Sequence, residues 1–212
     1  VDGSHLRKFD IVLANPPYSI KTWNREAFMN DKWGRNYLGT PPQGRADYAF
    51  IQHIISSMSD NNGRCAILLP HGVLGRDEEK DIRANLVESD VVECVIGIGR
   101  NLFYNSPMEA CILICKQNKR AGRKGKILFI DAKDKVTRKN AESNLEPGHI
   151  KEILDAYLRY DYIDGFSNVA SIEEIKQKGY MLAIPLYVSK NNKGSYDTIS
   201  SIKQFDECSR DM

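Results

Sequence analysis

The sequence predicts an α/β fold in which helices flank a largely parallel sheet. Residues 11–14 form a short apolar run with branched side chains, which is typical of a strand buried on both faces of a parallel sheet. Residues 47–59 carry apolar side chains at helical spacing from Ile51 onward. Residues 64–69 are a second apolar run, which Pro70 ends. Strand, helix and strand in this order predict a right-handed parallel crossover.

The first apolar run ends abruptly at Asn15-Pro16-Pro17-Tyr18. Each proline fixes its own φ, lacks an N–H and biases the preceding residue away from the α region. These four residues therefore predict a stiff, extended turn at the carboxyl end of a strand, where open α/β sheets bind ligands.

The groups that this turn presents suit an exocyclic amine. The side-chain carbonyl of Asn15 and the backbone carbonyl of Pro16 can accept both hydrogens of a planar amino group and draw its lone pair out of conjugation. Tyr18 adds a flat face for stacking, worth about 1–3 kcal/mol per base. The competing interpretation is an ordinary turn, because Asn-Pro and Pro-Pro are common in loops.

The Asn-Pro-Pro-Tyr turn resembles the catalytic motif of amino-group methyltransferases that use S-adenosylmethionine. Further blocks resemble the modification (M) subunit of type I restriction-modification systems, an N(6)-adenine DNA methyltransferase family, over about residues 9–188. These blocks are 46–53, 66–74, 101–104, 125–131 and 184–188.

The resemblance implies a Rossmann-like, S-adenosylmethionine-dependent methyltransferase sheet that is incomplete. The chain would hold its second half, with parallel strands that end in an antiparallel pair at 91–98 and 110–115, and a helical C-terminal extension. We expect residues 1–145 to be the C-terminal half of the catalytic domain, 146–190 a helical extension with a short strand, and 191–212 a polar tail or linker.

A cofactor-binding strand, glycine-rich turn and acidic residue are missing from the sequence. Gly97-Ile98-Gly99 lacks a third glycine and a convincing following helix. The resemblance places these elements upstream of the motif. We therefore expect an incomplete S-adenosylmethionine pocket to which Asn15 contributes, no metal, and an isolated chain without activity.

The resemblance implies methyl transfer to the exocyclic amino group of adenine in DNA, with Asn15, Pro16, Pro17 and Tyr18 as catalytic residues. The adenine would be flipped from the duplex, because its amine cannot be reached within the stack. Tyr18 and Phe103 would stack the flipped base, although Phe103 is equally expected to plug the core. Implied partners are DNA, a specificity (S) subunit, a second M subunit and a restriction (R) subunit.

Two alternatives remain. The first is an amino-methyltransferase that acts on a protein glutamine or on RNA, since those enzymes also use such a turn. The second is a non-catalytic DNA-binding or assembly module of a restriction-modification complex.

Basic residues gather between 116 and 139, opposed only by Asp131 and Asp134, although the formal net charge of the chain is only +2. Such an excess can neutralise phosphates. The DNA-backbone candidates are Lys119, Arg120, Arg123 and Lys124. A solvated loop is at least as good an interpretation.

The remaining pattern predicts helices at 77–89 and 147–160, a short strand at 127–131, a helix capped by Ser171 and Glu174, and a final strand at 180–188. The long segment 19–44 carries aromatic residues that either contact a displaced base or DNA backbone or form a local lid core.

The composition is that of a globular domain without a membrane span or signal peptide. The five cysteines do not suggest a disulfide framework or a metal site, and four of them lie in or beside apolar runs. We therefore expect a cytoplasmic protein that makes no membrane contact.

Overall fold

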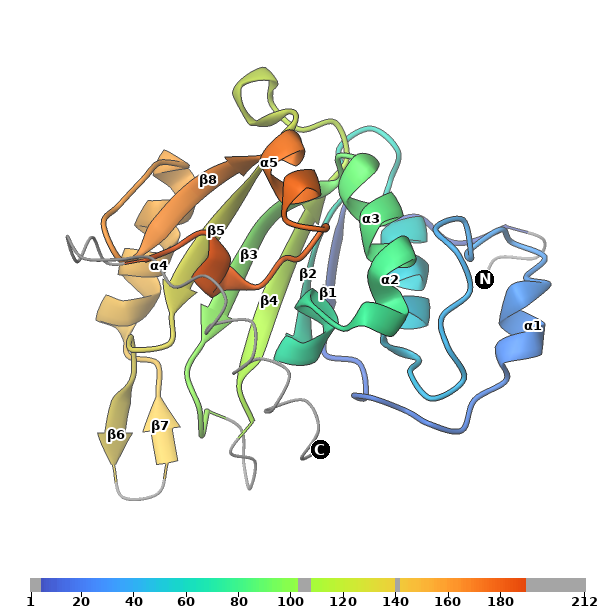
Figure 1. The fold of residues 1–212 in the computed structure, drawn as a ribbon, viewed down its shortest axis with the longest axis horizontal. Helices are drawn as coiled ribbons and strands as arrows, with labels where there is room; N and C mark the ends of the chain where they lie inside the picture. The colour runs from blue at the N-terminus through green and yellow to red at the C-terminus, as the bar shows by residue number, and fades with distance from the viewer. Residues whose placement is uncertain (1–4, 103–107, 140–141, 190–212) are drawn as a thin grey trace.

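The computed structural model describes residues 5–102, 108–139 and 142–189, and its centre is a six-stranded mixed sheet in the order β1-β2-β4-β3-β5-β8 (Figure 1). The strands of this sheet are β1 (Ile11–Ala14), β2 (Arg64–Pro70), β3 (Val92–Ile98), β4 (Ala110–Lys116), β5 (Lys126–Ala132) and β8 (Ser167–Ser171). A separate two-stranded ribbon pairs β6 (Thr137–Lys139) with β7 (Glu142–Asn144).

The pairing directions confirm the predicted α/β class and the parallel pairing of the two strands that flank α2. Strand β1 is parallel to β2, and β4 runs antiparallel between β2 and β3. The expected antiparallel pair is therefore present. The sheet continues beyond it, because β5 pairs parallel with β3 and β8 pairs antiparallel with β5.

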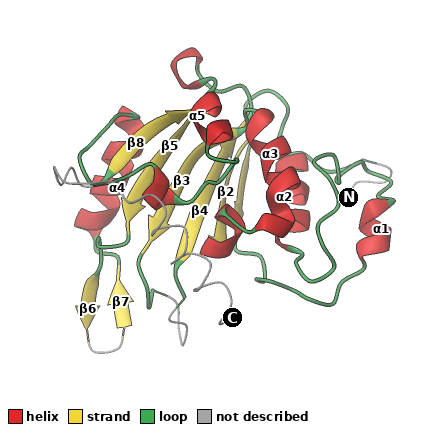
Figure 2. Ribbon diagram, in the orientation of Figure 1, coloured by secondary structure: helices red, strands yellow, loops and turns green. Residues whose placement is uncertain are grey.

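Helices cover both faces of the sheet (Figures 1 and 2). One face carries α2 (Asp47–Ser56), α3 (Lys80–Glu88) and α5 (Ile172–Gln177), whose Ile51, Leu86 and Ile175 belong to one core cluster. The opposite face carries α4 (Pro147–Arg159), with Ala156 in a second cluster. Short α1 (Arg25–Met29) lies beyond β1 at the side of the molecule.

Strand β1 differs from the prediction of burial on both faces. Val12 and Ala14 pack against the core cluster under α2. Ile11 and Leu13 point the other way and are 53% and 77% exposed. The reason is positional: within the described residues β1 is an edge strand, paired only with β2.

The C-terminal part corrects two further expectations. The predicted strand at 180–188 is wrong, because Ile184–Leu186 form a 3₁₀ turn and Tyr180 takes a left-handed φ of 60°. This segment instead covers the sheet, where Tyr187 stacks on Phe129 with ring centroids 3.9 Å apart. The missed strand is β8, whose serine and asparagine residues obscure a strand pattern.

The other expected elements are present with adjusted bounds. The predicted helix at 77–89 begins as a 3₁₀ turn, Asp77–Glu79, before α3. Ser171 caps α5 by accepting the Glu174 N–H at 3.1 Å. Four cysteines are buried and free, as expected: Cys65, Cys94, Cys111 and Cys115. In the part of the chain that the structure describes, no helix is long and apolar enough to cross a membrane.

The close turn between α2 and β2 yields a test of packing. A Cβ atom on Gly63 would lie 2.4 Å from the Ser59 backbone oxygen and 2.6 Å from the Met58 Cβ atom. We expect Gly63→Ala to lower the free energy of unfolding by about 1–3 kcal/mol, because rigid backbone must move. Gly44→Ala is the control, since a Cβ there meets open space. Equal losses of stability for both variants in urea denaturation would contradict this.

Candidate functional site

The Asn15–Tyr18 turn lies at the sheet edge where three strands meet. Strands β1 and β2 run parallel with Ala14 opposite Ile67, so both carboxyl ends point the same way. Antiparallel β4 begins at this edge, with Ala110 opposite Pro70. The turn is thus at the carboxyl edge of a parallel pair, as the sequence predicts.

In the turn, the Asn15 side chain is exposed to solvent and the Tyr18 ring is partly buried. Asn15 and Pro17 are exposed, whereas Pro16 and Tyr18 are partly buried. Burial raises the pKa of the Tyr18 phenol, and the nearby Cys111 and Asp47 side chains raise it further. Tyr18 therefore remains a neutral aromatic ring at physiological pH, suited to stacking.

His71 follows β2 at the same edge and is mostly withdrawn from solvent. Burial lowers the pKa of its imidazole, although the charges of Glu109 and Asp131 oppose that shift. Burial thus favours the neutral form of the imidazole at this edge of the sheet.

The loop after β3 approaches this edge at Leu102, and the chain is described again from Met108. Phe103, the second predicted stacking residue, lies outside the described residues.

The segment 19–44 forms a wall around a hollow of about 570 Å³ beside α2. Aromatic residues line much of it, among them Trp23, Phe28, Trp33 and Phe50. Trp23 packs edge-on against Phe28 with ring centroids 5.8 Å apart, and its indole N–H donates to the Gln43 carbonyl at 2.8 Å. Trp23 and Phe28 thus have local partners, and none of Asn15 to Tyr18 lines this hollow.

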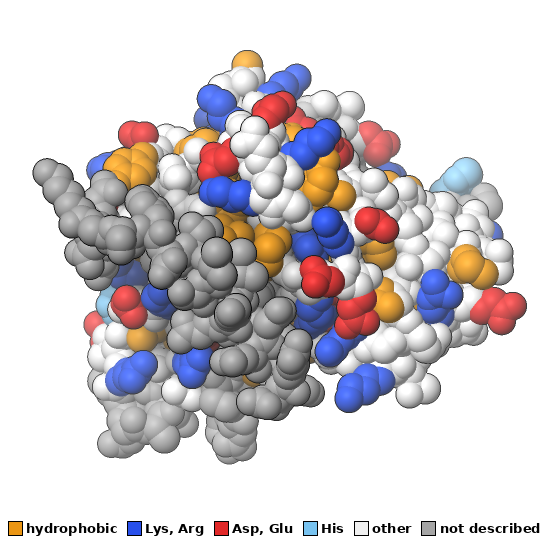
Figure 3. Space-filling model, viewed as in Figure 1, with side chains coloured by type: hydrophobic (Ala, Val, Ile, Leu, Met, Phe, Trp, Pro, Cys, Tyr) orange, Lys and Arg blue, Asp and Glu red, His pale blue; other side chains and the backbone are white. Residues whose placement is uncertain are grey.

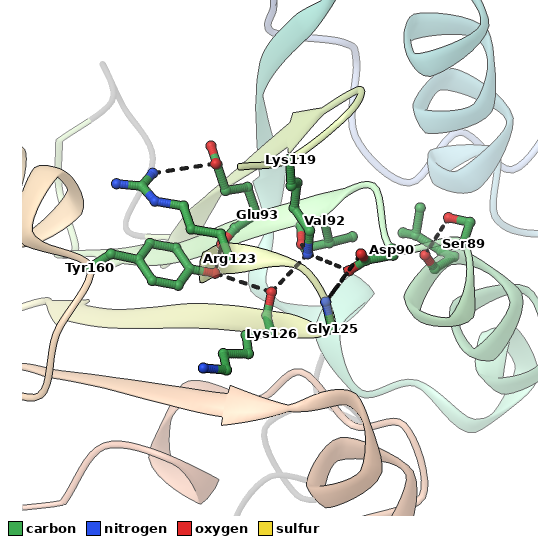
Figure 4. Close-up of polar contacts among 10 residues, drawn as sticks. Ser89, Asp90, Val92, Glu93, Lys119, Arg123, Gly125, Lys126 and Tyr160 are labelled. Carbon is green, nitrogen blue, oxygen red and sulfur yellow. Dashed lines mark hydrogen bonds and ion pairs between the residues drawn. The ribbon is translucent and has the colours of Figure 1, made fainter. Parts of the chain in front are cut away.

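Lys119, one of the predicted DNA-backbone residues, lies inside the protein (Figure 4). It is 4% exposed, and its ammonium donates to the backbone carbonyls of Val92 at 3.0 Å and Lys126 at 2.8 Å. The same ammonium forms an ion pair with Asp90. These three contacts engage all three donors of the ammonium, so its geometry argues against phosphate binding.

Arg123 also has internal partners. Its guanidinium lies 3.3 Å from a Glu93 carboxylate oxygen and donates to the carbonyls of Tyr157 and Leu158 at the end of α4. Its Cζ atom lies 4.3 Å from the Tyr160 ring centroid. This arginine joins α4 to the sheet.

Arg120 and Lys124, the other two candidates, have exposed side chains. Basic and acidic side chains are interspersed over the described part of the face in Figure 3 rather than gathered in one patch. The DNA-contact prediction therefore rests on these two residues alone.

We expect Lys119→Met to lower the free energy of unfolding by about 3 kcal/mol, because Asp90 and two carbonyls lose a buried partner. Lys124→Met makes the same chemical change at an exposed site and should alter stability by less than about 0.5 kcal/mol. Denaturant unfolding of both variants measures the difference. Unchanged stability of Lys119→Met would overturn the internal role.

The described residues offer limited means to hold a cofactor or metal. Within them, no group of three or more His, Cys, Asp or Glu side chains is arranged to bind a metal ion. The turn itself presents an exposed amide at Asn15, beside the edge of β1 that pairs with no other strand among the described residues. The exposed side-chain oxygen of Asn15 can accept a hydrogen bond from a planar amine at this edge.

Comparison with known proteins places this chain in a family. The family model described as "N-6 DNA Methylase" matches residues 2–195. The chain is 36% identical over 197 residues to the type I restriction enzyme HindI methylase subunit of Haemophilus influenzae, covering 86% of this chain and 42% of that protein. It is 37% identical over 194 residues to the MjaVIII methylase subunit of Methanocaldococcus jannaschii, covering 86% and 32%.

A solved structure agrees. The type I restriction-modification methyltransferase subunit from Streptococcus thermophilus superposes with a TM-score of 0.79 at 38% identity, covering 86% of this chain and 38% of that one. This chain spans less than half the length of the relatives named here. The family match covers most of the sequence, and the chain belongs to the N-6 DNA methylase family.

Proposed function

We propose that this chain is the base-binding part of a DNA methyltransferase that transfers a methyl group from S-adenosylmethionine to the exocyclic amine of adenine. The observation that carries the proposal is the rigid Asn15–Tyr18 turn, exposed at the carboxyl edge of a parallel strand pair. Membership of the N-6 DNA methylase family supports it.

The turn acts on the amine by hydrogen bonding. The Asn15 side-chain oxygen and the Pro16 carbonyl accept the two amine hydrogens, which concentrates the lone pair on nitrogen. The neutral Tyr18 ring stacks on the flipped base and holds it in one plane. S-adenosylmethionine supplies an electrophilic methyl group when bound. The role of this chain is to orient the amine toward that group.

The remaining half of the cofactor site would join at β1. Two observations support such a junction: Ile11 and Leu13 are exposed, and one edge of this strand pairs with no other strand among the described residues. Exposed apolar edges readily pair with further structure. The greater length of the relatives also supports it. In this proposal Asn15 contributes to the cofactor pocket, and the isolated chain is inactive.

As part of a type I modification subunit, the longer protein would assemble with a specificity subunit, a second modification subunit and a restriction subunit on DNA. A purely DNA-binding module is less well supported, because Lys119 and Arg123 have internal partners.

Replacement of Asn15 tests the catalytic proposal. In the longer protein that contains this chain, we expect Asn15→Ala to reduce transfer of labelled methyl groups to DNA at least about 100-fold, through loss of one amine acceptor. Asn61→Ala, in an exposed turn before β2, is the matched control and should retain activity. Product digestion should show N6-methyladenine. Label in RNA or protein instead of DNA would favour the alternative substrate class.

Calorimetric titration tests where the cofactor pocket lies. We expect the 212-residue chain to show no binding of S-adenosylmethionine, since a strand and glycine-rich turn are needed that its sequence lacks. The longer protein is the positive control. One-to-one binding to this chain alone would mean that the pocket is complete here.

A further inference from the structure

Ser19 follows the turn directly and is held in an unfavourable backbone conformation. Its φ is +49°, in the left-handed region that non-glycine residues rarely occupy. Its backbone N–H donates to the Asp47 Oδ1 atom at 2.8 Å. Its hydroxyl lies 3.4 Å from the Arg76 Nη2 atom. Two side chains from distant elements therefore fix the residue that ends the turn.

Asp47, the first residue of α2, uses both of its carboxylate oxygens in hydrogen bonds inside the protein. It is 1% exposed, and its second oxygen accepts from the Arg76 Nη1 atom at 2.8 Å. A buried carboxylate is stable only when paired and hydrogen-bonded. The Ser19 amide and the Arg76 guanidinium together satisfy this one.

Arg76 is placed by the loop that follows β2. A Cβ atom on Gly72 would lie 2.7 Å from the Arg76 Nε and Nη2 atoms, so the absence of a side chain at Gly72 leaves room for the guanidinium. The Arg76 carbonyl accepts from the fully buried Arg83 at 2.8 Å. Backbone and side chain of Arg76 are both anchored.

Glu79 is the second acidic partner of Arg76, at 3.2 Å. Burial raises the pKa of Glu79 to about 7, with the Asp47 charge adding to the shift and Arg76 and Arg83 opposing it. Near neutral pH this carboxyl is therefore partly protonated, and Glu79 is the weaker charge partner of Arg76. Asp47, in contrast, also accepts a hydrogen bond from the Ser19 backbone N–H.

We propose that Asp47 and Arg76 are positioning residues that set the conformation of the Asn15–Tyr18 turn through Ser19, an inference that rests on the function proposed above. The two residues join Ser19, which follows the turn after β1, to the start of α2 and to the loop after β2. A turn held at Ser19 keeps Tyr18 and the two amine acceptors in one geometry before the base arrives. Such preorganisation favours the chemical step rather than binding.

Hydrogen exchange measured by mass spectrometry tests the structural half of this proposal on the 212-residue chain. Asp47→Ala removes the acceptor of the Ser19 amide, and we expect exchange in a peptide spanning residues 15–22 to become at least about 10-fold faster. A peptide from β3 should be unchanged. Asp47→Asn keeps a side-chain oxygen for the Ser19 N–H and should restore most of the protection.

Glu93→Gln is the matched control, because Glu93 is also 1% exposed and bonded to an arginine, but its carboxylate accepts from the Tyr157 hydroxyl of α4 on the other side of the sheet. It should leave exchange at residues 15–22 unchanged. If Asp47→Ala fails to fold, Arg76→Gln replaces it, with the same expected loss of protection at the turn. Unchanged exchange at the turn in a folded Asp47→Ala or Arg76→Gln chain overturns the proposal.

Kinetics of the longer protein test the functional half. Asp47→Ala should lower kcat for methyl transfer at least about 10-fold and change KM for S-adenosylmethionine less than twofold. Asp47→Asn should recover part of kcat, and Glu93→Gln should match the wild type. A change confined to KM overturns the positioning role. A wild-type protein that methylates no DNA overturns the proposed function instead, while the exchange result still decides whether Asp47 holds the turn.

Discussion

The parallel pairing of β1 with β2 is the constraint on which the candidate site depends. Because Ala14 lies opposite Ile67, Asn15 leaves the sheet at the same edge as His71. Antiparallel β4 begins at that edge, between β2 and β3, and its second residue, Cys111, lies near the Tyr18 phenol. The strand register therefore gathers residues that are distant in the sequence, and no side-chain interaction is needed to explain their meeting.

Much of this arrangement follows from local sequence. Apolar periodicity, proline stops and the Ser171 cap identify α2, β2 and α5, because each depends on residues a few positions apart. The turn at Asn15 is predictable for the same reason. The exposed face of β1 is not, since a strand's neighbours in the sheet decide its burial. The segment around Ile184 is rich in apolar residues because it covers the sheet. Its apolar pattern resembles that of a strand, and the sequence alone does not distinguish the two.

The basic segment shows a second limit of local pattern. Lys119 and Lys124 are chemically identical and five positions apart, yet one is buried and one exposed. Lys119 is buried because its ammonium binds Asp90 and the Val92 carbonyl. These two partners are 29 and 27 positions from Lys119 in the sequence. A charge run alone therefore measures local composition, whereas phosphate binding requires side chains that have no competing internal partners.

The buried ion pair of Asp47 and Arg76 has a different role from the ion pair of Glu93 and Arg123. Arg123 holds α4 against the sheet, so its replacement should lower the free energy of unfolding. Asp47 binds the backbone amide next to the turn, so its replacement should first increase the mobility of Ser19. Two prolines restrict the turn from within, but neither can donate a hydrogen bond. The first amides available to anchor the turn after these prolines are those of Tyr18 and Ser19. Asp47 binds the amide of Ser19. The prolines limit the shapes of the turn, whereas this hydrogen bond to another element fixes its position relative to the rest of the protein.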